Sequence, residues 1–414
     1  MSHRRRHHHR LHQAVISAGL SRFIPGNQVT LLQNGEAYFP AIEAAFDRAR
    51  YEIYLETYIY ENDATGRRIA DALKRAALRG VNVYVLIDGY GSKDLPRGML
   101  GSLRADGVKT LIYRPKISPW TFRRKRLRRM HRKIAVVDRE IAFVGGINII
   151  DDATGDMPPR YDYAVAVEGP LVDVIRHSAQ HLWSTVAWSY FRKGTVRGFL
   201  PASTFAGGRM SVAFLVRDNI RHRRDIEVAY LKAIEQAKSE IIIANAYFLP
   251  GLDFRHALIN AAGRGVRVVL LLQGRVEYLL LHYASRALYG NLLDAGIEIY
   301  EYRKSFLHAK VAVIDGHWAT VGSSNIDPYS LLLSREANVV VEDEEFGAVL
   351  TQSLKQTMEV DGRRILKDNW KQQPPSFRFM SWLSYGLVRL LMGMAGYARE
   401  NIGPKNDRTP DPEE

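Results

Sequence analysis

The segment MHRKIAVVDREIAFVGGINI, residues 130–149, is the stretch from which the fold of the whole chain is predicted. His131 and Lys133 stand two residues apart, directly before an apolar run. Residues two apart on a β-strand point to the same face of a sheet. The segment therefore predicts a buried strand that presents an imidazole and an ammonium group side by side at its edge.

The same pattern returns near the other end of the chain, in LHAKVAVIDGHWATVGSSNI, residues 307–326. His308 and Lys310 take the places of the first histidine and lysine. An aspartate closes each apolar run, and an asparagine follows each glycine-containing turn. These residues are Asp138 and Asn148 in the first segment and Asp315 and Asn325 in the second. Two copies of so specific a pattern indicate a duplicated fold.

The duplication extends beyond the two motifs. Matched segments that alternate between helical and strand patterns precede each motif. These segments are 34–60 with 224–250 and 68–89 with 253–274. After each motif, a strand that opens with a carboxylate leads into a helix, at Asp162 and at Glu336. Strands that alternate with helices predict an α/β fold with helices on both faces of each sheet.

We predict four parts in the chain. A basic N-terminal segment covers residues 1–26, and two tandem α/β/α sandwich units cover 27–200 and 208–360. An amphipathic C-terminal segment with a polar tail covers 361–414. If the units pack about a pseudo-twofold axis, the two motifs meet in one shared site. The two units are then related domains with cores of their own.

Composition excludes several classes of protein. The chain has 414 residues and no cysteine, which excludes disulfides, thiolate metal sites and a cysteine nucleophile. Its formal net charge of +14 favours a polyanionic partner, either nucleic acid or anionic lipid. The N-terminus lacks the apolar core of a secretory signal. No apolar run reaches the roughly 18 residues that predict a membrane-spanning helix.

The apolar segment 376–398 is interrupted by arginines and predicts a helix that lies in a membrane interface. Its polar residues fall on one arc of a helical wheel and its large apolar residues, Trp382 among them, on the rest. The polar arc holds Arg378, Ser381, Ser384 and Arg389. The alternative is a helix that packs on the core of the second unit.

A basic run, residues 121–133, leads directly into the first motif. Its cations are expected to contact anionic headgroups, where each contributes about 1 kcal/mol. The residues concerned are Arg123, Arg124, Lys125 and Arg126. A solvated loop and a contact with a nucleic-acid backbone remain alternatives, because cationic runs suit both.

The paired motifs suit phosphoryl transfer. Two lysines and two asparagines would neutralise and bind the oxygens of a phosphoryl group. One imidazole would attack phosphorus, and the other would protonate the leaving alkoxide. This chemistry needs neither a metal nor a cofactor, and we expect none. The residues leave open which histidine attacks.

The acidic residues receive different interpretations. Asp138 and Asp315 stand where each strand ends, which favours a turn residue or a structural ion pair. Asp162 and Glu336 would each steady an imidazole by accepting a hydrogen bond from one ring nitrogen. A solvated strand end is an equal alternative for both.

The stretches HRKIAVVD and HAKVAVID match HxKxxxxD, and GGIN and GSSN match the element that follows it. The chain thus resembles the phospholipase D superfamily, and within it most closely the short, B-type bacterial cardiolipin synthases. The resemblance implies a metal-independent ping-pong reaction through a phosphohistidine. One phosphatidylglycerol would donate a phosphatidyl group and release glycerol, and a second would accept it to give cardiolipin.

The resemblance also implies roles for residues. The catalytic motif set comprises His131, Lys133, Asp138, His308, Lys310 and Asp315, of which the aspartates are mostly structural in the family, with Asn148 and Asn325 on the phosphate beside the lysines. Asp162 and Glu336 would orient the histidines. The family more often uses the first histidine for attack, and the cations before His131 would keep it neutral.

Other functions stay open at this point. One is a phospholipase D-type hydrolase or, less well supported, a nuclease. Another is a silent protein that binds anionic membranes or nucleic acid. The apolar C-terminal segment favours lipid, so we expect no nucleic-acid partner and a peripheral position on the bacterial inner membrane. The acceptor alcohol, the membrane side and the oligomeric state do not follow from the sequence.

Overall fold

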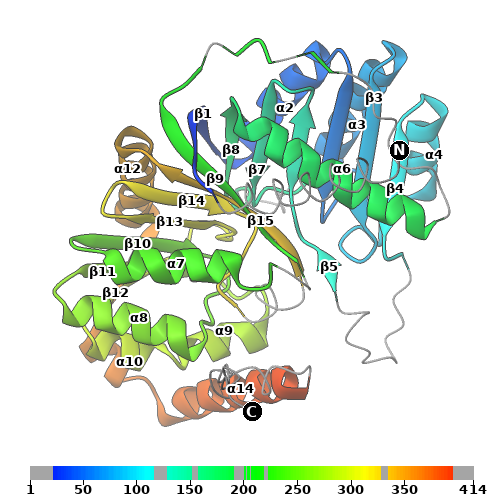
Figure 1. The fold of residues 1–414 in the computed structure, drawn as a ribbon. Coiled ribbons are helices and arrows are strands. Elements are labelled where there is room, and N and C mark those ends of the chain that lie inside the picture. The colour runs from blue at the N-terminus through cyan, green and yellow to red at the C-terminus, as the bar shows by residue number, and fades with distance from the viewer. Residues whose placement is uncertain are drawn as a thin grey trace, which may run out of the picture.

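The structure is a computed structural model that describes residues 22–115, 128–151, 157–190, 200–201, 203–205, 207–218, 222–327 and 334–394. Its two α/β halves lie side by side (Figure 1). We call residues 22–190 the first half and residues 207–365 the second half. Within the described ranges, 16 strands form one mixed sheet that runs through both halves.

The first half contributes its strands in the order β4, β3, β2, β6, β7, β8, β1. The bounds are β1 (Ile24–Gln33), β2 (Glu52–Thr57), β3 (Asn82–Asp88), β4 (Lys109–Tyr113), β6 (Ile134–Val137), β7 (Ile141–Gly145) and β8 (Tyr163–Glu168). Helices α2 (Asn34–Arg48), α3 (Ala64–Leu78) and α4 (Arg97–Ala105) cover one face, and α6 (Leu171–Ser189) covers the other. The sheet is covered on both faces, so its central strands are buried.

The second half repeats this arrangement. Its strands are β9 (Met210–Arg217), β10 (Glu240–Asn245), β11 (Arg267–Gln273), β12 (Glu298–Tyr302), β13 (Lys310–Ile314), β14 (Trp318–Gly322), β15 (Ser334–Glu342) and β16 (Gly362–Ile365). Its helices are α7 (Asp225–Gln236), α8 (Leu252–Gly263), α9 (Leu279–Arg286), α10 (Tyr289–Asp294) and α12 (Glu344–Asp361), and the short helix α13 (Lys367–Lys371) follows β16. β16 pairs with β12, so the sheet continues past the expected boundary at residue 360.

The halves are joined more closely than two tandem units with separate cores would be. β1 pairs antiparallel with β9, which links the two sheets edge to edge. α6 contacts β9 and α12 contacts β1, so each helix covers strands of both halves. One core cluster contains Val165 and Leu171 of the first half together with Phe214 and Val339 of the second. The expectation of an independent core in each unit was therefore incomplete, because apolar surface is also buried between them.

The C-terminal helix α14 (Pro375–Met394) packs against α9. Ser381 and Val388 face inward and are 3% and 2% exposed, whereas Trp382 and Leu390 face outward and are 68% and 60% exposed. The serines of the predicted polar arc thus face the protein, and the large apolar residues face solvent. Val388 belongs to the core of the second half, so the helix is also not separate from that core.

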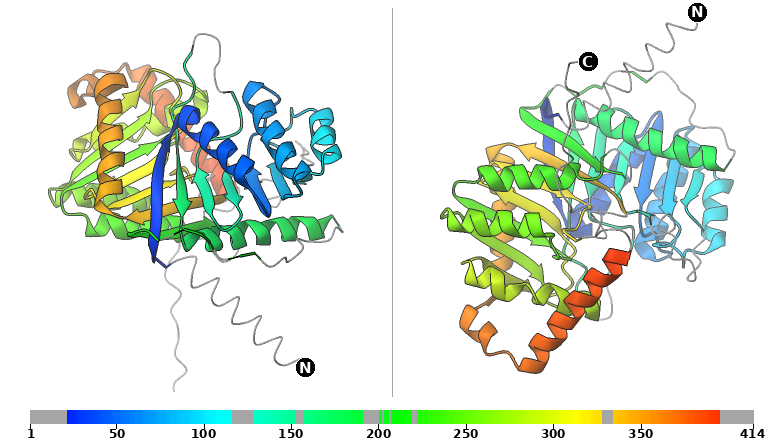
Figure 2. Two further views of the ribbon diagram at one scale, coloured as in Figure 1. Left: turned by 90° about the horizontal axis from the view of Figure 1, so that it is seen from above. Right: turned by 60° about the horizontal axis from the view of Figure 1, so that its bottom comes forward.

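In Figure 2, α14 runs from the outer edge of the second half toward the junction of the two halves. None of the helices in the described ranges combines the length and the apolar character that crossing a membrane requires.

Candidate functional site

Each motif histidine is anchored by the opposite half of the protein. The short strand β5 (Arg129–Met130) pairs with the start of β15, and His131 N donates to the carbonyl of Arg335 at 2.9 Å. In the matching place of the second half, His308 N donates to the carbonyl of Tyr161 at 2.8 Å. The backbone at His131 is therefore held by β15, which carries Glu336, and the backbone at His308 is held by Tyr161, directly before Asp162.

The acidic residues cross in the same way. His131 Nδ1 lies 3.1 Å from Glu336 Oε2, and His308 Nδ1 lies 2.6 Å from Asp162 Oδ2. Both carboxylates are buried. Such a bond selects the tautomer and leaves Nε2 as the reactive nitrogen. The geometry supports the orienting role over the solvated strand end, and it assigns each acid to the histidine of the other half.

A glycine and a serine at matching positions explain how the two acids fit. A side chain on Gly146 would meet the carboxylate of Asp162, with a Cβ only 2.4 Å from Oδ1. The matching residue of the second half is Ser323, whose hydroxyl donates to Glu336 Oε2 at 2.6 Å. The first half thus leaves space for its acid, while the second half adds a hydrogen bond to it.

The two lysines are buried beside the histidines. Each ammonium group donates to the backbone carbonyl of the histidine two residues before it, at 2.8 Å for Lys133. Burial lowers the pKa of Lys133 to about 7, against the opposing charge of Glu336. Burial likewise lowers the pKa of Lys310 to about 8, against Asp162. Both groups would gain charge when an anion binds, which suits a site for a phosphoryl group.

The surroundings of both imidazoles disfavour the protonated form. Burial is the main cause that lowers the pKa of His131, and Glu336 opposes it. For His308, burial and the nearby charges of Lys310 and Arg160 lower the pKa well below its usual value. A neutral imidazole is the form that attacks phosphorus, and a bound anion would raise both pKa values again.

The motif asparagines are buried in the turns after β7 and β14. Asn148 Oδ1 accepts a hydrogen bond from Ile59 N at 3.2 Å, which orients its carboxamide. In the second half the turn is held by Asn245, whose Oδ1 accepts from Ile326 N at 3.2 Å beside Asn325. The described ranges contain no group of three histidine or acidic side chains placed to bind a metal ion.

Asp138 and Asp315 do not belong with the histidines. Each sits in a turn at positive φ, 53° and 52°. Asp138 accepts from Arg50 N, Tyr51 N and Glu52 N at 2.8–3.0 Å, and Asp315 accepts in the same way from residues 238–240. The geometry supports the interpretation of both aspartates as turn residues, because they fasten the turn after each motif strand to the start of its neighbour.

Two positioning residues did not emerge from the sequence. Asp88, at the end of β3, accepts from Met130 N at 2.9 Å, and Gln273, at the end of β11, accepts from Leu307 N at 3.2 Å. Each thus holds the residue directly before a motif histidine. The signal was present in the matched stretches LIDG and LLQG, where both side chains precede a glycine at equivalent places of the repeat.

The family model for the phospholipase D-like domain of cardiolipin synthase matches residues 42–184 and 230–358. The chain belongs to this family. Each matched stretch contains one histidine–lysine motif, the asparagine that follows it and the acid that contacts the histidine of the other stretch. The resemblance predicted from the paired motifs is therefore confirmed.

Curated members of the cardiolipin synthase family match most of the chain. Cardiolipin synthase B of Salmonella typhimurium is 43% identical over 353 residues, which is 83% of this chain and 85% of that protein. Cardiolipin synthase B of Escherichia coli K12 is 43% identical over 343 residues, 82% of each chain. The cardiolipin synthase of Geobacillus thermodenitrificans is 34% identical over 321 residues, 75% of this chain and 62% of that protein.

Solved structures support the fold alone. A phosphatidylserine synthase of Haemophilus influenzae superposes with a TM-score of 0.65 at 13% identity and covers 92% of this chain and 98% of that one. A polyphosphate kinase of Porphyromonas gingivalis superposes with a TM-score of 0.53 at 15% identity, over 80% of this chain and 50% of that one.

The predicted headgroup contacts fall partly outside the structure. Arg123, Arg124, Lys125 and Arg126 lie outside the described residues. Trp382 is described, and it projects from the outer side of α14.

Proposed function

We propose that the protein is a cardiolipin synthase that transfers a phosphatidyl group from one phosphatidylglycerol to another, with release of glycerol. The observation that carries the proposal is the crossed pair of His131 with Glu336 and His308 with Asp162. Two imidazoles, of which His308 is buried and His131 partly exposed, are each oriented from the opposite half and each lie beside a lysine. They form the acid–base and nucleophile set of one shared site. Membership of the cardiolipin synthase family indicates that the substrate is a phospholipid.

In the first half-reaction, Nε2 of one histidine attacks phosphorus and forms a P–N bond. The P–O bond to glycerol breaks, and the second imidazolium gives its proton to the leaving oxygen. In the second half-reaction, that imidazole takes the proton from a hydroxyl of another phosphatidylglycerol. The hydroxyl oxygen attacks phosphorus, the P–N bond breaks, and cardiolipin leaves with the first histidine restored.

The crossed acids favour His131 as the nucleophile. Glu336 Oε2 is shared between His131 and the hydroxyl of Ser323, and buried Arg217 also attracts Glu336. Because its charge is shared in this way, Glu336 is expected to stabilise a protonated His131 less strongly. Asp162 makes a shorter contact with His308. We propose that His308 takes up a proton only once the bound phosphate anion offsets the nearby charges of Lys310 and Arg160, as general acid–base chemistry requires.

The outer side of α14 is proposed to lie in the membrane interface. Its exposed apolar residues are Phe379, Met380, Trp382, Leu383, Leu387 and Leu390. The patch continues on Tyr278 and Leu279, at the start of α9, beside Glu277 near the buried lysine Lys310. A lipid bound along this surface reaches the site with its chains in the bilayer. The enzyme would then sit peripherally on a bacterial inner membrane, with the basic segment 121–129 on anionic headgroups.

Purified full-length protein, incubated with labelled phosphatidylglycerol vesicles in chelator, tests the reaction. Cardiolipin and free glycerol are expected in equal amounts. Phosphatidate in place of cardiolipin would support the hydrolase instead. Activity that vanished in chelator and returned with a divalent ion would overturn the proposed mechanism.

Vesicle sedimentation tests the membrane surface. The double variant Trp382→Glu/Leu390→Glu should bind anionic vesicles roughly tenfold or more weakly, since each apolar side chain contributes about 1.5–3 kcal/mol when buried. Leu78→Glu is the matched control, because Leu78 is equally exposed but lies on α3 of the first half. Full sedimentation of a folded double variant would exclude α14 as the membrane contact.

A further inference from the structure

The segment that leads into Asp162 runs alongside the second motif. Tyr161 N donates to the carbonyl of Phe306 at 2.9 Å, and His308 N donates to the carbonyl of Tyr161 at 2.8 Å. Residues two apart on such an extended segment point to the same side, so Arg160 lies on the side of Asp162. The guanidinium carbon of Arg160 is 5.6 Å from the centre of the Phe306 ring. This contact places a guanidinium beside the second motif.

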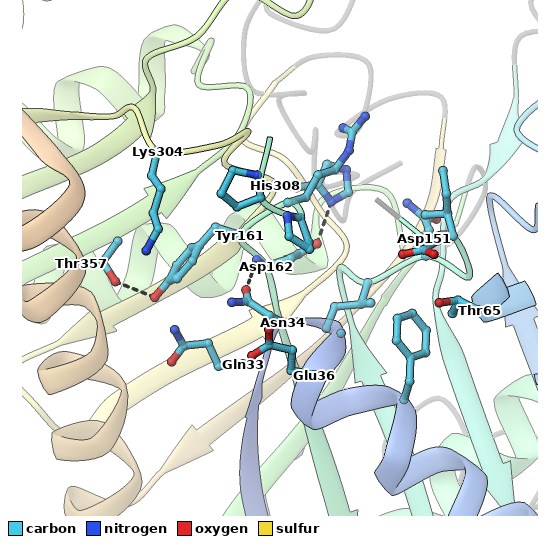
Figure 3. A pocket seen from close by; sticks show the side chains of 18 of the residues that line it. Gln33, Asn34, Glu36, Thr65, Asp151, Tyr161, Asp162, Lys304, His308 and Thr357 are labelled. Atoms are coloured by element: carbon cyan, nitrogen blue, oxygen red, sulfur yellow. Dashed lines mark hydrogen bonds and ion pairs between the residues drawn. The ribbon is translucent and has the colours of Figure 1, made fainter. Parts of the chain in front are cut away.

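Arg160 also lines the cavity that leads to the site. The cavity has a volume of about 930 Å³ and lies between the two halves, with α2 on one side and α12 on the other (Figure 3). Its lining includes Arg160 together with His308, Asp162 and Asn148. Burial and Lys310 lower the pKa of His308, and the charge of Arg160 adds to this effect. The guanidinium is therefore near enough to act on a ligand at the site.

Glu277 of the second half fixes the position of Arg160. Arg160 Nη1 lies 2.7 Å from Glu277 Oε1, and the hydroxyl of Tyr247 donates to the other carboxylate oxygen. The next two residues, Tyr278 and Leu279, are exposed and belong to the proposed membrane surface. The ion pair thus holds the guanidinium where that apolar surface meets the cavity.

The acceptor in the second half-reaction brings a second phosphate to the site. A phosphatidylglycerol acceptor carries its own phosphodiester at the far end of the glycerol whose hydroxyl attacks. The lysines and asparagines of the motifs are assigned to the phosphate that is transferred, so the second anion needs a cation of its own. That cation must lie on the side of His308, which takes the proton of the attacking hydroxyl. A guanidinium suits it, because its paired N–H groups match two phosphate oxygens.

We propose that Arg160 binds the phosphodiester of the acceptor phosphatidylglycerol and so selects an acceptor that carries a phosphate. The inference rests on the proposed function and adds a specificity-determining residue to it. Glu277 orients the guanidinium before the acceptor arrives, and the bound phosphate then shares it. The chemical step is unchanged, because the acceptor hydroxyl still attacks phosphorus while His308 takes its proton.

A competition between two acceptors tests the proposal. Phosphatidyl-p-nitrophenol serves as donor, because it has no hydroxyl group and its released p-nitrophenol reports the first half-reaction. The acceptors, mixed in the same vesicles, are phosphatidylglycerol and a monoalkylglycerol, which presents the same diol without a phosphate. Arg160→Gln should shift the ratio of the two transfer products roughly tenfold or more toward the monoalkylglycerol, since a charge-assisted contact with only one acceptor is lost. The effect of Arg160 on His308 applies to both acceptors and cancels in the ratio.

Three further variants sharpen the test. Arg160→Lys keeps the charge and should retain part of the preference for phosphatidylglycerol. The paired change Arg160→Gln/Glu277→Gln leaves no unpaired carboxylate and should shift the ratio as far as Arg160→Gln does. Arg303→Gln is the matched control, because Arg303 pairs with Glu301 at 2.7 Å but does not line the cavity. The control should keep the wild-type ratio.

An unchanged product ratio in the folded Arg160→Gln and paired variants would overturn the inference. So would an equal loss of transfer to both acceptors, since Arg160 would then act on the site as a whole and not on the acceptor phosphate. Failure of the proposed function would appear in the wild-type protein instead. It would release p-nitrophenol without forming either transfer product, and the inference would fall with it.

Discussion

The His131 side and the His308 side of the site carry the same reactive groups, but different buried residues pack beneath them. Beneath His131, buried Arg132 Nε lies 2.8 Å from Glu56 Oε2, and Arg132 Nη1 donates to Ser178 at 3.1 Å. The matching positions beneath His308 are Ala309 and Ala244, which carry no charge. One copy of the repeated strand thus lies on a buried ion pair and the other on apolar packing.

The His308 side is supported by hydroxyl groups instead. Tyr161 and Tyr163 flank Asp162, and their hydroxyls lie 2.6 Å apart. Tyr161 reaches Thr357 Oγ1 at 2.6 Å and Tyr163 reaches Ser353 Oγ at 2.7 Å, both on α12 of the second half. The comparison shows that duplication retains the reactive groups, while the buried groups around them diverge. The two histidines therefore differ in their electrostatic surroundings.

Removing either histidine should have the largest effect and should separate the two roles. His131→Ala and His308→Ala should each reduce turnover by roughly 10⁴-fold, because each group acts in both half-reactions. With a labelled donor whose leaving group needs no protonation, His308→Ala should still form phosphatidyl-enzyme and His131→Ala should not. An alkaline quench preserves the phosphohistidine for detection. Label on His131→Ala alone would reverse the assignment.

Breaking the ion pair beneath His131 should have the next largest effect, this time on folding. Glu56→Ala leaves the buried guanidinium of Arg132 unpaired and should lower the free energy of unfolding by about 3–5 kcal/mol. The paired change Glu56→Leu/Arg132→Met makes this side apolar, like the other half. The paired change should lower the free energy of unfolding by less than Glu56→Ala does. Chemical denaturation measures the free energy of unfolding of both variants. A paired variant as unstable as Glu56→Ala would show that apolar packing cannot replace the charges.

The two lysines should lose their charge at different pH values, which distinguishes the two sides of the site. As pH rises, Lys133 loses its proton near its pKa of about 7 and Lys310 near its pKa of about 8. Charge that attracts the phosphate is then lost, so kcat/KM for phosphatidylglycerol should fall above pH 7. Lys133→Arg keeps its charge and should move this fall toward pH 8. A profile unaltered by the substitution would mean that Lys133 does not set the alkaline limb.

Substitution of Ser323 should have the smallest effect, which is confined to the pKa of His131. Ser323→Ala removes the hydroxyl that shares Glu336 Oε2 with His131, which leaves more negative charge for the imidazole. The pKa of His131 should rise, so the acidic limb of kcat/KM should move to higher pH, by about one unit or less. Gly146 has no side chain at the matching place. A shift to lower pH would contradict the view that Ser323 weakens the support of Glu336.

Several sequence predictions hold in the structure for clear reasons. His131 and Lys133 lie in the link between β5 and β6, and Lys310 opens β13 two residues after His308; each lysine donates to the carbonyl of its histidine. The alternation of strands and helices gave the α/β class, and the doubled motif gave the family. Asp88 and Gln273 could have been found by aligning the two halves of the chain with each other. The membrane role of α14 remains a proposal.

The sequence by itself determined the duplication, the chemical groups of the site and the strand faces that carry them, because these depend on neighbours a few residues apart. The tertiary structure alone decided that Asp162 contacts His308 and that Glu336 contacts His131, across separations of 146 and 205 residues. It also decided that β1 pairs with β9 and that the serine side of α14 faces inward. The periodicity of a segment shows which side chains share a face. The surface that this face meets depends on how the whole chain buries its apolar area.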